Sequence, residues 1–81
     1  MAYSVYIVRC SDSTYYTGIA TDVKRRVQEH NTSPKGARYT RTRRPVTLVY
    51  TEEHPDRSSA SKREYAIKRM TRTEKQKLID T

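Results

Sequence analysis

Two neighbouring segments near the beginning of the chain constrain its fold more than any other feature. Tyr3–Cys10 is rich in β-branched and aromatic residues, and Thr14–Ile19 has the same character. A short polar turn, Ser11–Ser13, separates them. Two strand-like segments joined by so short a turn predict an antiparallel β-hairpin.

The register of this hairpin decides which side chains share a face. We expect the turn to bring Cys10 opposite Thr14. Tyr6 then lies opposite Gly18, and Tyr6 and Tyr16 become diagonal neighbours on one face. A slip of one residue would separate the two tyrosines, so their proximity depends on this register.

The rest of the chain carries patterns that are typical of regular structure. Helices are expected from Thr21 or Asp22 to about His30, over Ser58–Met70 and after the capping box that begins at Thr71, and a third strand is expected over Val46–Thr51. This order, β-β-α-β-α-α, predicts an α+β fold in which helices cover at least one face of an antiparallel sheet. The length of 81 residues predicts a single domain over residues 1–81.

The composition limits the core that such a domain can build. The sequence has no Trp and no Phe, 33% of its residues are hydrophobic, and its seven tyrosines carry all the aromatic bulk. Burial must therefore come from Val, Ile, Leu and the tyrosine rings, whose hydroxyl groups need partners or water. These limits predict a small core.

The charge of the chain indicates its partners. There are 17 Lys and Arg residues against 9 Asp and Glu, a formal net charge of +8, and such a field attracts polyanions by counterion release. A nucleic acid is therefore the leading expectation. An anionic membrane surface would need an amphipathic helix with a bulky apolar face, which this sequence lacks.

The location of the protein follows from two further observations. The sequence has no long apolar run and no apolar segment behind a basic start, so we expect neither a transmembrane helix nor a signal peptide. Its one cysteine, Cys10, cannot form an internal disulfide and fits a reducing compartment. We expect a cytoplasmic protein, as a monomer or a weak homodimer.

Glu64 is an acid at a helix position where the pattern favours an apolar side chain. The sparse apolar residues of the same helix, Ala60, Ile67 and Met70, fall on one stripe at helical spacing, and Glu64 lies between them. A carboxylate held against apolar surface costs several kcal/mol unless it is paired, protonated or bound to a metal. Glu64 is therefore either the partner of a buried cation such as Arg26 or part of a chemical site.

Four other candidates, Tyr6, Tyr16, Arg26 and His30, each have an ordinary interpretation. Strand tyrosines are usually sheet-surface aromatics. An arginine beside an apolar stripe usually packs its stem and keeps its charged end in water. A histidine near a helix C-terminus is often a cap that favours the helix dipole. Together with Glu64, however, the four suit the hydrolysis of a phosphodiester.

The chemistry of such a site would divide among these residues. The acid can hold Mg²⁺ through one carboxylate, with waters completing the octahedron, and the metal stabilises charge on the phosphate and the leaving oxygen. The arginine forks onto non-bridging oxygens. A tyrosine hydroxyl can take a proton from water if the cation and Arg26 favour the phenolate.

These residues resemble the motifs of the GIY-YIG nuclease domain family, and the resemblance covers nearly all of the chain, from Tyr3 to about Ile79. The motif positions match this sequence at Ser4–Tyr6, Tyr16–Gly18, Arg26, His30 and Glu64. The sequence departs from the motifs at Ser4, Val5 and Thr17. Those positions shape strand packing rather than carry chemistry, so the resemblance implies an intact site.

The resemblance implies a three-stranded antiparallel sheet between helices, and cleavage of DNA that depends on Mg²⁺ or Mn²⁺. It assigns one metal ion to Glu64, neutralisation of the scissile phosphate to Arg26 and an assisting role to His30. One motif tyrosine acts as general base in this family and the other positions water or phosphate, and we favour Tyr6 as the base. The stretch Gly36–Thr40 is similar to the compact single-domain branch.

The connection Asn31–Pro45 is long for so small a domain and dense in positive charge, and such loops are usually functional or disordered. Arginines fork onto phosphates, and an aromatic ring can stack on an exposed base. Six side chains are therefore candidates for nucleic-acid binding: Lys35, Arg38, Tyr39, Arg41, Arg43 and Arg44. The alternative is a solvated charged loop. Contacts to the phosphate backbone of a nucleic acid carry little sequence specificity.

We therefore expect a small endonuclease that acts on DNA with little sequence specificity in repair, recombination or processing, with a preference for branched, nicked or single-stranded forms. The alternative is a basic nucleic-acid-binding module of the same fold without catalysis, and RNA stays open as the ligand under both hypotheses. A basic stabilising protein without an active site explains the charge but not the positions of Tyr6, Tyr16 and Glu64.

Overall fold

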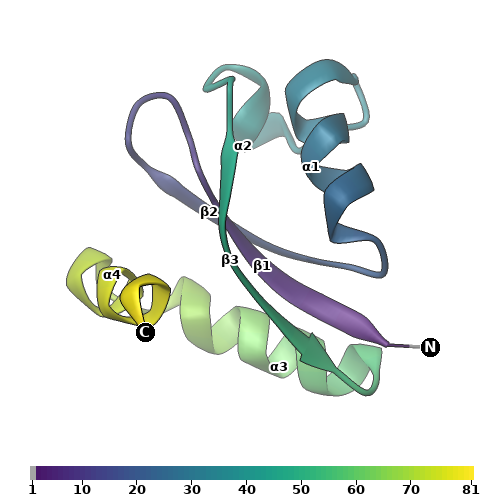
Figure 1. Ribbon diagram of the computed structural model, residues 1–81, viewed down its shortest axis with the longest axis vertical. Coiled ribbons are helices and arrows are strands. Elements are labelled where there is room, and N and C mark those ends of the chain that lie inside the picture. The colour runs from purple at the N-terminus through teal and green to yellow at the C-terminus, as the bar shows by residue number, and fades with distance from the viewer. Residues whose placement is uncertain (1) are drawn as a thin grey trace.

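The computed structural model describes residues 2–81 of the chain. Three strands, β1 (Tyr3–Arg9), β2 (Tyr15–Ala20) and β3 (Thr47–His54), form one antiparallel sheet in the order β2-β1-β3. The central strand β1 pairs with both neighbours, so β2 and β3 are the two edges (Figure 1). The expected α+β fold with a three-stranded antiparallel sheet is confirmed.

The β1–β2 hairpin has the expected register. Tyr6 pairs with Gly18, and Val8 pairs with Tyr16 two residues away, so the two tyrosines share a face. Ser13 closes the turn with a φ of 68°, the left-handed conformation that a three-residue hairpin loop uses at its last position. The polar turn therefore sets the register on which the proximity of the tyrosines depends.

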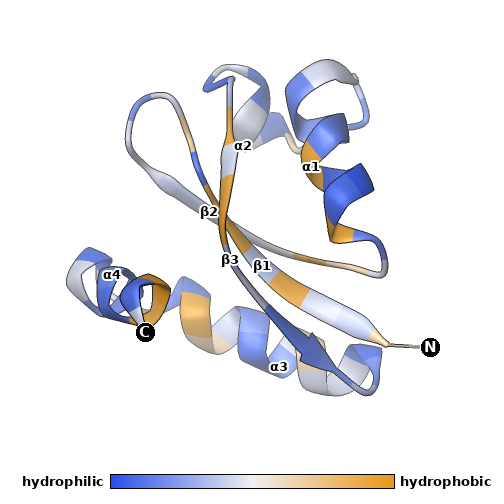
Figure 2. Ribbon diagram, in the orientation of Figure 1, coloured by the Kyte–Doolittle hydropathy of each residue, from blue (hydrophilic) through white to orange (hydrophobic). Residues whose placement is uncertain are grey.

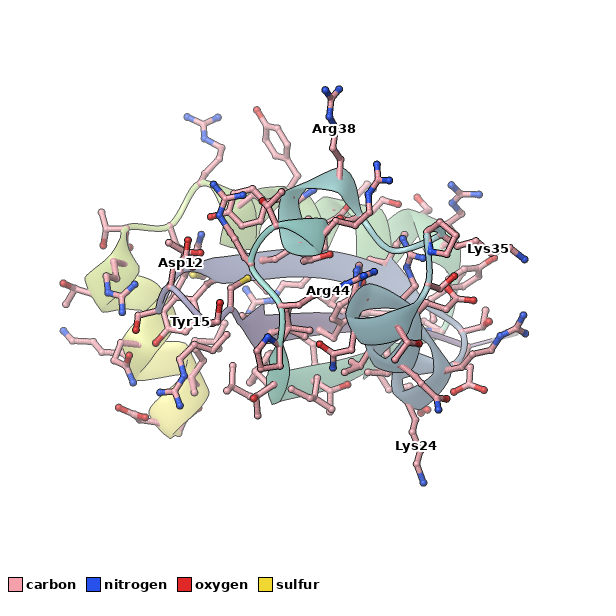
Figure 3. The ribbon with its side chains drawn as sticks, turned by 90° about the horizontal axis from the view of Figure 1, so that it is seen from above. Asp12, Tyr15, Lys24, Lys35, Arg38 and Arg44 are labelled. Atoms are coloured by element: carbon pink, nitrogen blue, oxygen red, sulfur yellow. The ribbon has the colours of Figure 1, made fainter. Side chains whose placement is uncertain are left out.

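Helices cover both faces of the sheet. They are α1 (Val23–Thr32), α2 (Arg38–Arg41), α3 (Arg57–Lys68) and α4 (Arg72–Asp80). Figure 1 shows α1 and α2 on one side of the sheet and α3 with α4 on the other. In Figure 3, which looks from above, Lys24 of α1 and Arg38 of α2 point in opposite directions. Across residues 2–81, no helix combines the length and apolar character needed to cross a membrane.

The core has two halves, because alternate residues of β1 point to opposite faces of the sheet. Val5 and Ile7 pack against Ala60 and Ile67 of α3, and all four are fully buried. The half on the α1 side is built from Tyr6, Val8, Cys10 and Val46, with Val23 and Val27 packed against them. Figure 2 shows hydrophobic residues along the strands and at separate positions of the helices, among residues that are hydrophilic or intermediate.

The helix starts follow the predicted caps. Asp22, one of the two expected caps of α1, accepts a hydrogen bond from the main-chain N–H of Arg25 at 3.0 Å. Thr71 and Glu74 form the expected capping box at the beginning of α4. These caps satisfy main-chain donors that a helix start leaves free.

Three elements differ from the sequence-based expectation. The connection Asn31–Pro45 contains a single helical turn, α2, which was not predicted. Helix α3 ends at Lys68 rather than Met70. Strand β3 continues three residues beyond Thr51, to His54, although the added residues are polar.

The continuation of β3 has a physical reason in the partners of Glu52. Its carboxylate accepts a hydrogen bond from the Tyr50 hydroxyl at 2.5 Å, lies 2.6 Å from Nε2 of His54, and accepts from Nε of Arg63 at 3.1 Å. These partners compensate the partial burial of a carboxylate in the sheet. The pairing is not visible in the sequence, because Arg63 comes from α3.

Candidate active site at the β2 edge of the sheet

Tyr6 lies in the protein interior with 1% of its surface exposed, and its Oη is 2.6 Å from Nε2 of His30. Gly18 makes room for this hydroxyl, because a Cβ there would lie 2.5 Å from Oη. Burial, and then the neighbouring Tyr16, raise the pKa of Tyr6 to about 12, against the opposing effect of Arg26. Tyr6 is therefore a buried phenol at neutral pH and not a sheet-surface aromatic.

His30 of α1 lies between the two tyrosines. It is fully buried, and the centre of its ring is 5.8 Å from that of Tyr6 and 5.3 Å from that of Tyr16. Burial, followed by the charge of Arg26, lowers the pKa of His30 to about 4, so the ring is neutral at pH 7. A neutral ring does not stabilise the helix dipole as a cation does, so dipole capping does not explain this residue.

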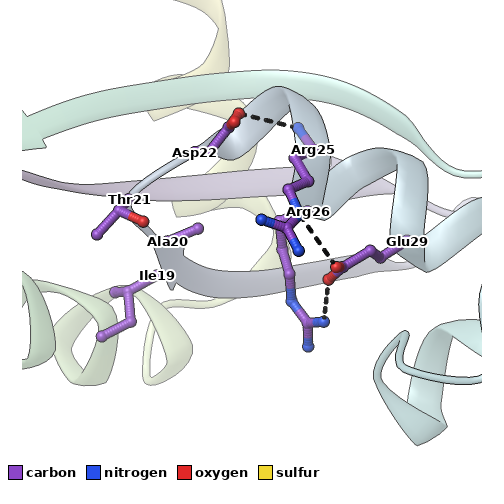
Figure 4. A pocket seen from close by; sticks show the side chains of 7 residues that line it. All are labelled: Ile19, Ala20, Thr21, Asp22, Arg25, Arg26 and Glu29. Atoms are coloured by element: carbon purple, nitrogen blue, oxygen red, sulfur yellow. Dashed lines mark hydrogen bonds and ion pairs between the residues drawn. The ribbon is translucent and has the colours of Figure 1, made fainter.

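Arg26 enters the same cluster from α1, close enough to the Tyr6 hydroxyl to oppose in part the effect of burial on its pKa. Its Nη1 donates to Oε1 of Glu29 at 2.9 Å and to the main-chain oxygen of Lys35 at 2.8 Å. Glu29, and not Glu64, is thus its carboxylate partner. Arg26 and Glu29 line a pocket of about 270 Å³ where β2 meets α1 (Figure 4). A phosphate that enters this pocket would meet a guanidinium already paired with a carboxylate.

Glu64 approaches from the other layer of the fold, on α3. Its side chain is 23% exposed, and its Oε2 lies 3.3 Å from Nζ of Lys68. The same Nζ lies 5.9 Å from the centre of the Tyr16 ring. After burial and Tyr16, the charge of Glu64 also contributes to the raised pKa of Tyr6. The acid therefore reaches the β2 edge beside Tyr16, which shares a face of the sheet with Tyr6 of the central strand.

Tyr39 and Arg43, both expected to bind nucleic acid, are engaged within the protein. The Tyr39 ring stacks on Tyr16 with 6.0 Å between ring centres and 23° between planes, and the Arg43 guanidinium lies 3.9 Å from the Tyr39 ring centre. Asp12 holds Arg43 in place through an Nε–Oδ2 hydrogen bond of 3.0 Å. Stacking of a base on Tyr39 would therefore require the ring to leave one of its two neighbours.

Arg44 binds main-chain oxygens at the end of α1. Its Nε donates to His30 O at 2.5 Å, and its Nη2 donates to Ser33 O at 2.5 Å and to Glu29 O at 3.4 Å. In Figure 3 its side chain lies over the body of the protein between α1 and α2. The geometry thus gives Arg44 the role of a helix cap, and its contact with phosphate stays a prediction.

The remaining candidates of the loop face solvent. Lys35, Arg38 and Arg41 are all exposed. Figure 3 shows Arg38 extended from α2 away from the body of the protein, and Lys35 at the far end of the same loop. These three side chains are free to approach a polyanion without disturbing the fold.

Comparison with known proteins agrees with the motifs. Residues 2–78 match the GIY-YIG catalytic domain. The chain belongs to the GIY-YIG family. It is 63% identical over 78 residues to a UPF0213 protein of Desulfotalea psychrophila, covering 96% of this chain and 71% of that one. It is 55% identical over 75 residues to a UPF0213 protein of Halobacterium salinarum, covering 93% and 96% of the two chains.

Two solution NMR structures share the fold of this GIY-YIG domain. The UPF0213 protein from Bacillus halodurans is 44% identical with a TM-score of 0.63, and a protein from E. faecalis is 40% identical with a TM-score of 0.67. Both alignments cover 99% of this chain and 84% of the other. Membership in the GIY-YIG family indicates a nuclease-type domain that binds nucleic acid.

GIY-YIG nucleases generally depend on a divalent metal. Within residues 2–81, no group of three or more His, Cys, Asp or Glu side chains could hold a metal ion by itself. Mg²⁺ usually keeps several waters and binds through one or two carboxylates together with substrate phosphates. Glu64 could provide one such carboxylate if it left Lys68. One carboxylate fits a largely hydrated ion whose other ligands would be water and a substrate phosphate.

Sequence reasoning missed three residues of this GIY-YIG site. Glu29 and Lys68 pair with Arg26 and Glu64 at helical spacings of three and four residues, a signal that was available in the sequence. Thr40 is fully buried with its Oγ1 3.0 Å from a ring nitrogen of the site histidine. No sequence pattern indicates that contact, because it depends on how the loop folds back over α1.

Proposed function

We propose that this protein is a metal-dependent endonuclease that hydrolyses phosphodiester bonds of DNA with little sequence specificity. The observation that carries the proposal is the convergence of Tyr6, Tyr16 and Arg26 around one buried histidine, with Glu64 arriving at the same edge from α3. A structural core needs no acid beside two phenols. A phosphodiesterase site has a use for each of these groups.

The division of roles follows from charge and position. Arg26 would exchange Glu29 for a non-bridging oxygen of the scissile phosphate, and the pocket beside it would receive the flanking nucleotide. Glu64 would hold one Mg²⁺ or Mn²⁺, which when bound supplies positive charge to the phosphate and the leaving oxygen. In the reaction the tyrosine would first lose its own proton to solvent. Its phenolate oxygen would then take the water proton as the water oxygen bonds to phosphorus, and the bond to the leaving oxygen would break, that oxygen taking a proton from solvent.

The state of the two tyrosines decides which of them acts as the base. Tyr6 has a pKa of about 12, so the resting protein holds a phenol at this position. It can act as a base only when further positive charge at the site favours its phenolate. Tyr16 lies nearer the surface, beside Lys68 and Tyr39, and suits the positioning of water or phosphate. We therefore keep Tyr6 as the proposed base.

The exposed basic residues are proposed to bind the DNA backbone. Lys35, Arg38 and Arg41 offer positive charge without a fixed internal partner among the described contacts. Contacts of this kind address phosphates, so they position the substrate without reading its sequence. Branched, nicked or single-stranded DNA is the proposed preference, and DNA repair or processing the proposed setting.

A second candidate is a nucleic-acid-binding module of the same fold with negligible catalysis. One observation favours it, because the two charged groups proposed for catalysis are already occupied. Arg26 is paired with Glu29, and Glu64 is paired with Lys68. If these pairs persist in the complex with DNA, the chain binds without cutting, and RNA could equally be its ligand.

Cleavage assays separate the two candidates. Labelled duplex, flap and single-stranded DNA are incubated with wild-type protein and Glu64→Ala, in Mg²⁺ or in EDTA, and gel shifts record binding in parallel. We expect wild-type cleavage in Mg²⁺ that is lost in EDTA and in Glu64→Ala, with binding retained. Binding without cleavage in Mg²⁺ and in Mn²⁺ would favour the non-catalytic module. Cleavage that persists unchanged in Glu64→Ala would contradict the proposed site.

A further inference from the structure

The buried side of His30 carries contacts that the proposed reaction does not use. Its Nδ1 accepts a hydrogen bond from the main-chain N–H of Ala37 at 3.1 Å and lies 3.0 Å from Oγ1 of Thr40. His30 and Thr40 are both fully buried. On the opposite side of the ring, Nε2 lies 2.6 Å from Oη of Tyr6. Both ring nitrogens are therefore engaged, and the engagement of one determines what the other can do.

The main-chain contact decides where the ring proton lies. A peptide N–H can only donate, so Nδ1 must accept from Ala37 and cannot itself carry a hydrogen. In a neutral imidazole the one hydrogen then lies on Nε2. This nitrogen is the partner of Tyr6, so His30 donates to the Tyr6 oxygen. The other tautomer would set two hydrogens against each other between Ala37 and Nδ1.

Thr40 supports the same arrangement. Its hydroxyl lies 2.9 Å from the main-chain oxygen of Ala37 and 3.0 Å from Nδ1, so its single hydrogen has two possible acceptors. The Ala37 oxygen already accepts from the N–H groups of Thr40 and Arg41, at 3.1 and 3.2 Å. The single Nδ1 lone pair already accepts from Ala37 N–H, so both acceptors are engaged to the same degree. An oxygen lone pair turned toward the Nδ1 lone pair at 3.0 Å would repel it, however, whereas the hydroxyl hydrogen placed between them removes that repulsion. We therefore assign the Thr40 hydrogen to Nδ1.

We propose that Thr40 and the main chain of Ala37 hold His30 as its Nε2–H tautomer, so that His30 is a hydrogen-bond donor to Tyr6 and not the acceptor of its proton. Thr40 is thus a positioning residue that acts through His30. The consequence for Tyr6 rests on the proposed function. The hydroxyl hydrogen of Tyr6 points elsewhere than to His30, and its oxygen, once deprotonated, keeps His30 as a donor with the charge of Arg26 nearby.

The loop that carries these donors is held tightly against α1. At Gly36 a Cβ would lie 2.7 Å from the main-chain oxygen of Glu29 and 2.9 Å from Cα of His30, so only glycine allows this approach. The approach places the next N–H, that of Ala37, within reach of Nδ1. The fold of the loop and the protonation of the histidine are therefore parts of one arrangement.

The tautomer can be read directly by long-range ¹H–¹⁵N NMR spectra of the His30 ring in the wild-type protein at pH 7, without DNA or metal. We expect Nδ1 to be the unprotonated nitrogen and Nε2 to carry the hydrogen. A spectrum with the hydrogen on Nδ1 would overturn the proposal. This measurement does not need nuclease activity, so a protein that fails to cut DNA would contradict the proposed function while the tautomer is still decided.

Variants test the part assigned to Thr40. Thr40→Val keeps the shape and removes the hydroxyl, Thr40→Ser keeps the hydroxyl, and Thr47→Val alters an exposed threonine of β3 as the matched control. In Thr40→Val we expect the Nδ1 signal to move toward that of a free acceptor nitrogen, and kcat to fall on the order of tenfold with KM little changed. Thr40→Ser and Thr47→Val should resemble the wild type.

Two results would contradict the role assigned to Thr40. A folded Thr40→Val with an unchanged Nδ1 signal and unchanged kcat would overturn its positioning role. If Thr40→Val does not fold, the positioning role of the hydroxyl is tested by comparing Thr40→Ser with the wild type. The serine hydroxyl must then reproduce the wild-type Nδ1 signal. A Thr40→Ser spectrum that resembles a free acceptor nitrogen would overturn the proposal.

Discussion

At the scale of single residues, His30 shows how burial changes the chemistry that a side chain offers. Its place near the C-terminus of α1 would suit a cation, yet it is fully buried between two phenols with its pKa lowered to about 4 by burial and by Arg26. A neutral ring with fixed neighbours is a defined hydrogen-bond partner for Tyr6, because its single hydrogen has one place to go. The surroundings of the histidine, rather than its type, determine its role.

This burial predicts a loss of stability in weak acid. The unfolded chain binds a proton at His30 near its ordinary pKa of 6.5, whereas the folded chain does so only near 4. Stability is therefore present above pH 6.5 and falls as the pH is lowered toward 4. Between pH 7 and pH 5 this residue should cost about 2 kcal/mol of unfolding free energy.

Urea unfolding at the two pH values measures this effect in wild type and in His30→Gln. The glutamine variant removes the titrating group, so its stability should change by about 2 kcal/mol less over the same interval. Both proteins contain the same carboxylates, so the contribution of these groups to the pH dependence cancels when the two changes in stability are compared. An equal loss of stability in the two proteins would show that His30 does not titrate as described.

The residues of the basic loop show what sequence reasoning could and could not provide. The two tyrosines, Arg26 and Glu64 were predicted together because their motif spacing is distinctive. Charge alone, however, does not tell whether an arginine binds a substrate or its own chain. Arg43 is held by Asp12, 31 residues earlier, and Arg44 by oxygens of α1. Those partners are remote in sequence, so only the fold identifies them.

At the scale of elements, local patterns predicted what local interactions determine. The hairpin register and the capping box depend on residues close in sequence, and both were predicted. Helix α2 was missed because a single turn in a loop with Pro and Gly has no periodic signal. The end of β3 was missed because one of the three partners that accommodate Glu52 in the sheet, Arg63, comes from α3 and is remote in sequence.

The junction of α1 with the basic loop predicts different effects for two neighbouring arginines. Arg44 donates to three main-chain oxygens at the end of α1, whereas Arg41 is exposed. Arg44→Ala should lower the unfolding free energy by about 1 to 3 kcal/mol, because buried acceptors lose a charged donor. Arg41→Ala should change it by less than about 0.5 kcal/mol. Urea denaturation of the two variants provides the measurement.

The same pair also separates stability from binding. Arg41→Ala should weaken DNA binding at full stability, whereas Arg44→Ala should bind nearly as the wild type does under conditions where it is folded. Equal stability of the two variants would contradict the capping role that the geometry gives to Arg44.

At the scale of the whole molecule, the basic residues behind the net charge of +8 do not all have the same role. Several arginines are engaged within the fold, and the basic residues that remain exposed differ in direction. Figure 3 shows Arg38 and Lys24 pointing to opposite sides of the protein. We expect DNA to lie along the side that carries Arg38, the β2 edge and the catalytic candidates.

The salt dependence of DNA affinity tests this direction. Each phosphate contact that is lost lowers the slope of log K against log salt concentration by about 1. Arg38→Ala should therefore show a slope about 1 smaller than the wild type, and Lys24→Ala should show no change. Fluorescence anisotropy over a salt series measures both slopes. A smaller slope for Lys24→Ala, together with an unchanged slope for Arg38→Ala, would place the DNA on the other side of the protein.

We propose above that the carboxylate of Glu64 makes the β2 edge a metal-dependent phosphodiesterase site. The most direct test is the initial rate of cleavage of one fluorescent DNA substrate in Mg²⁺ by the wild type, by Glu64→Gln and by Glu53→Gln, which removes an exposed acid of the other edge strand. We predict a loss on the order of 10²-fold or more for Glu64→Gln and a wild-type rate for Glu53→Gln. Equal rates for the two variants would contradict the claim.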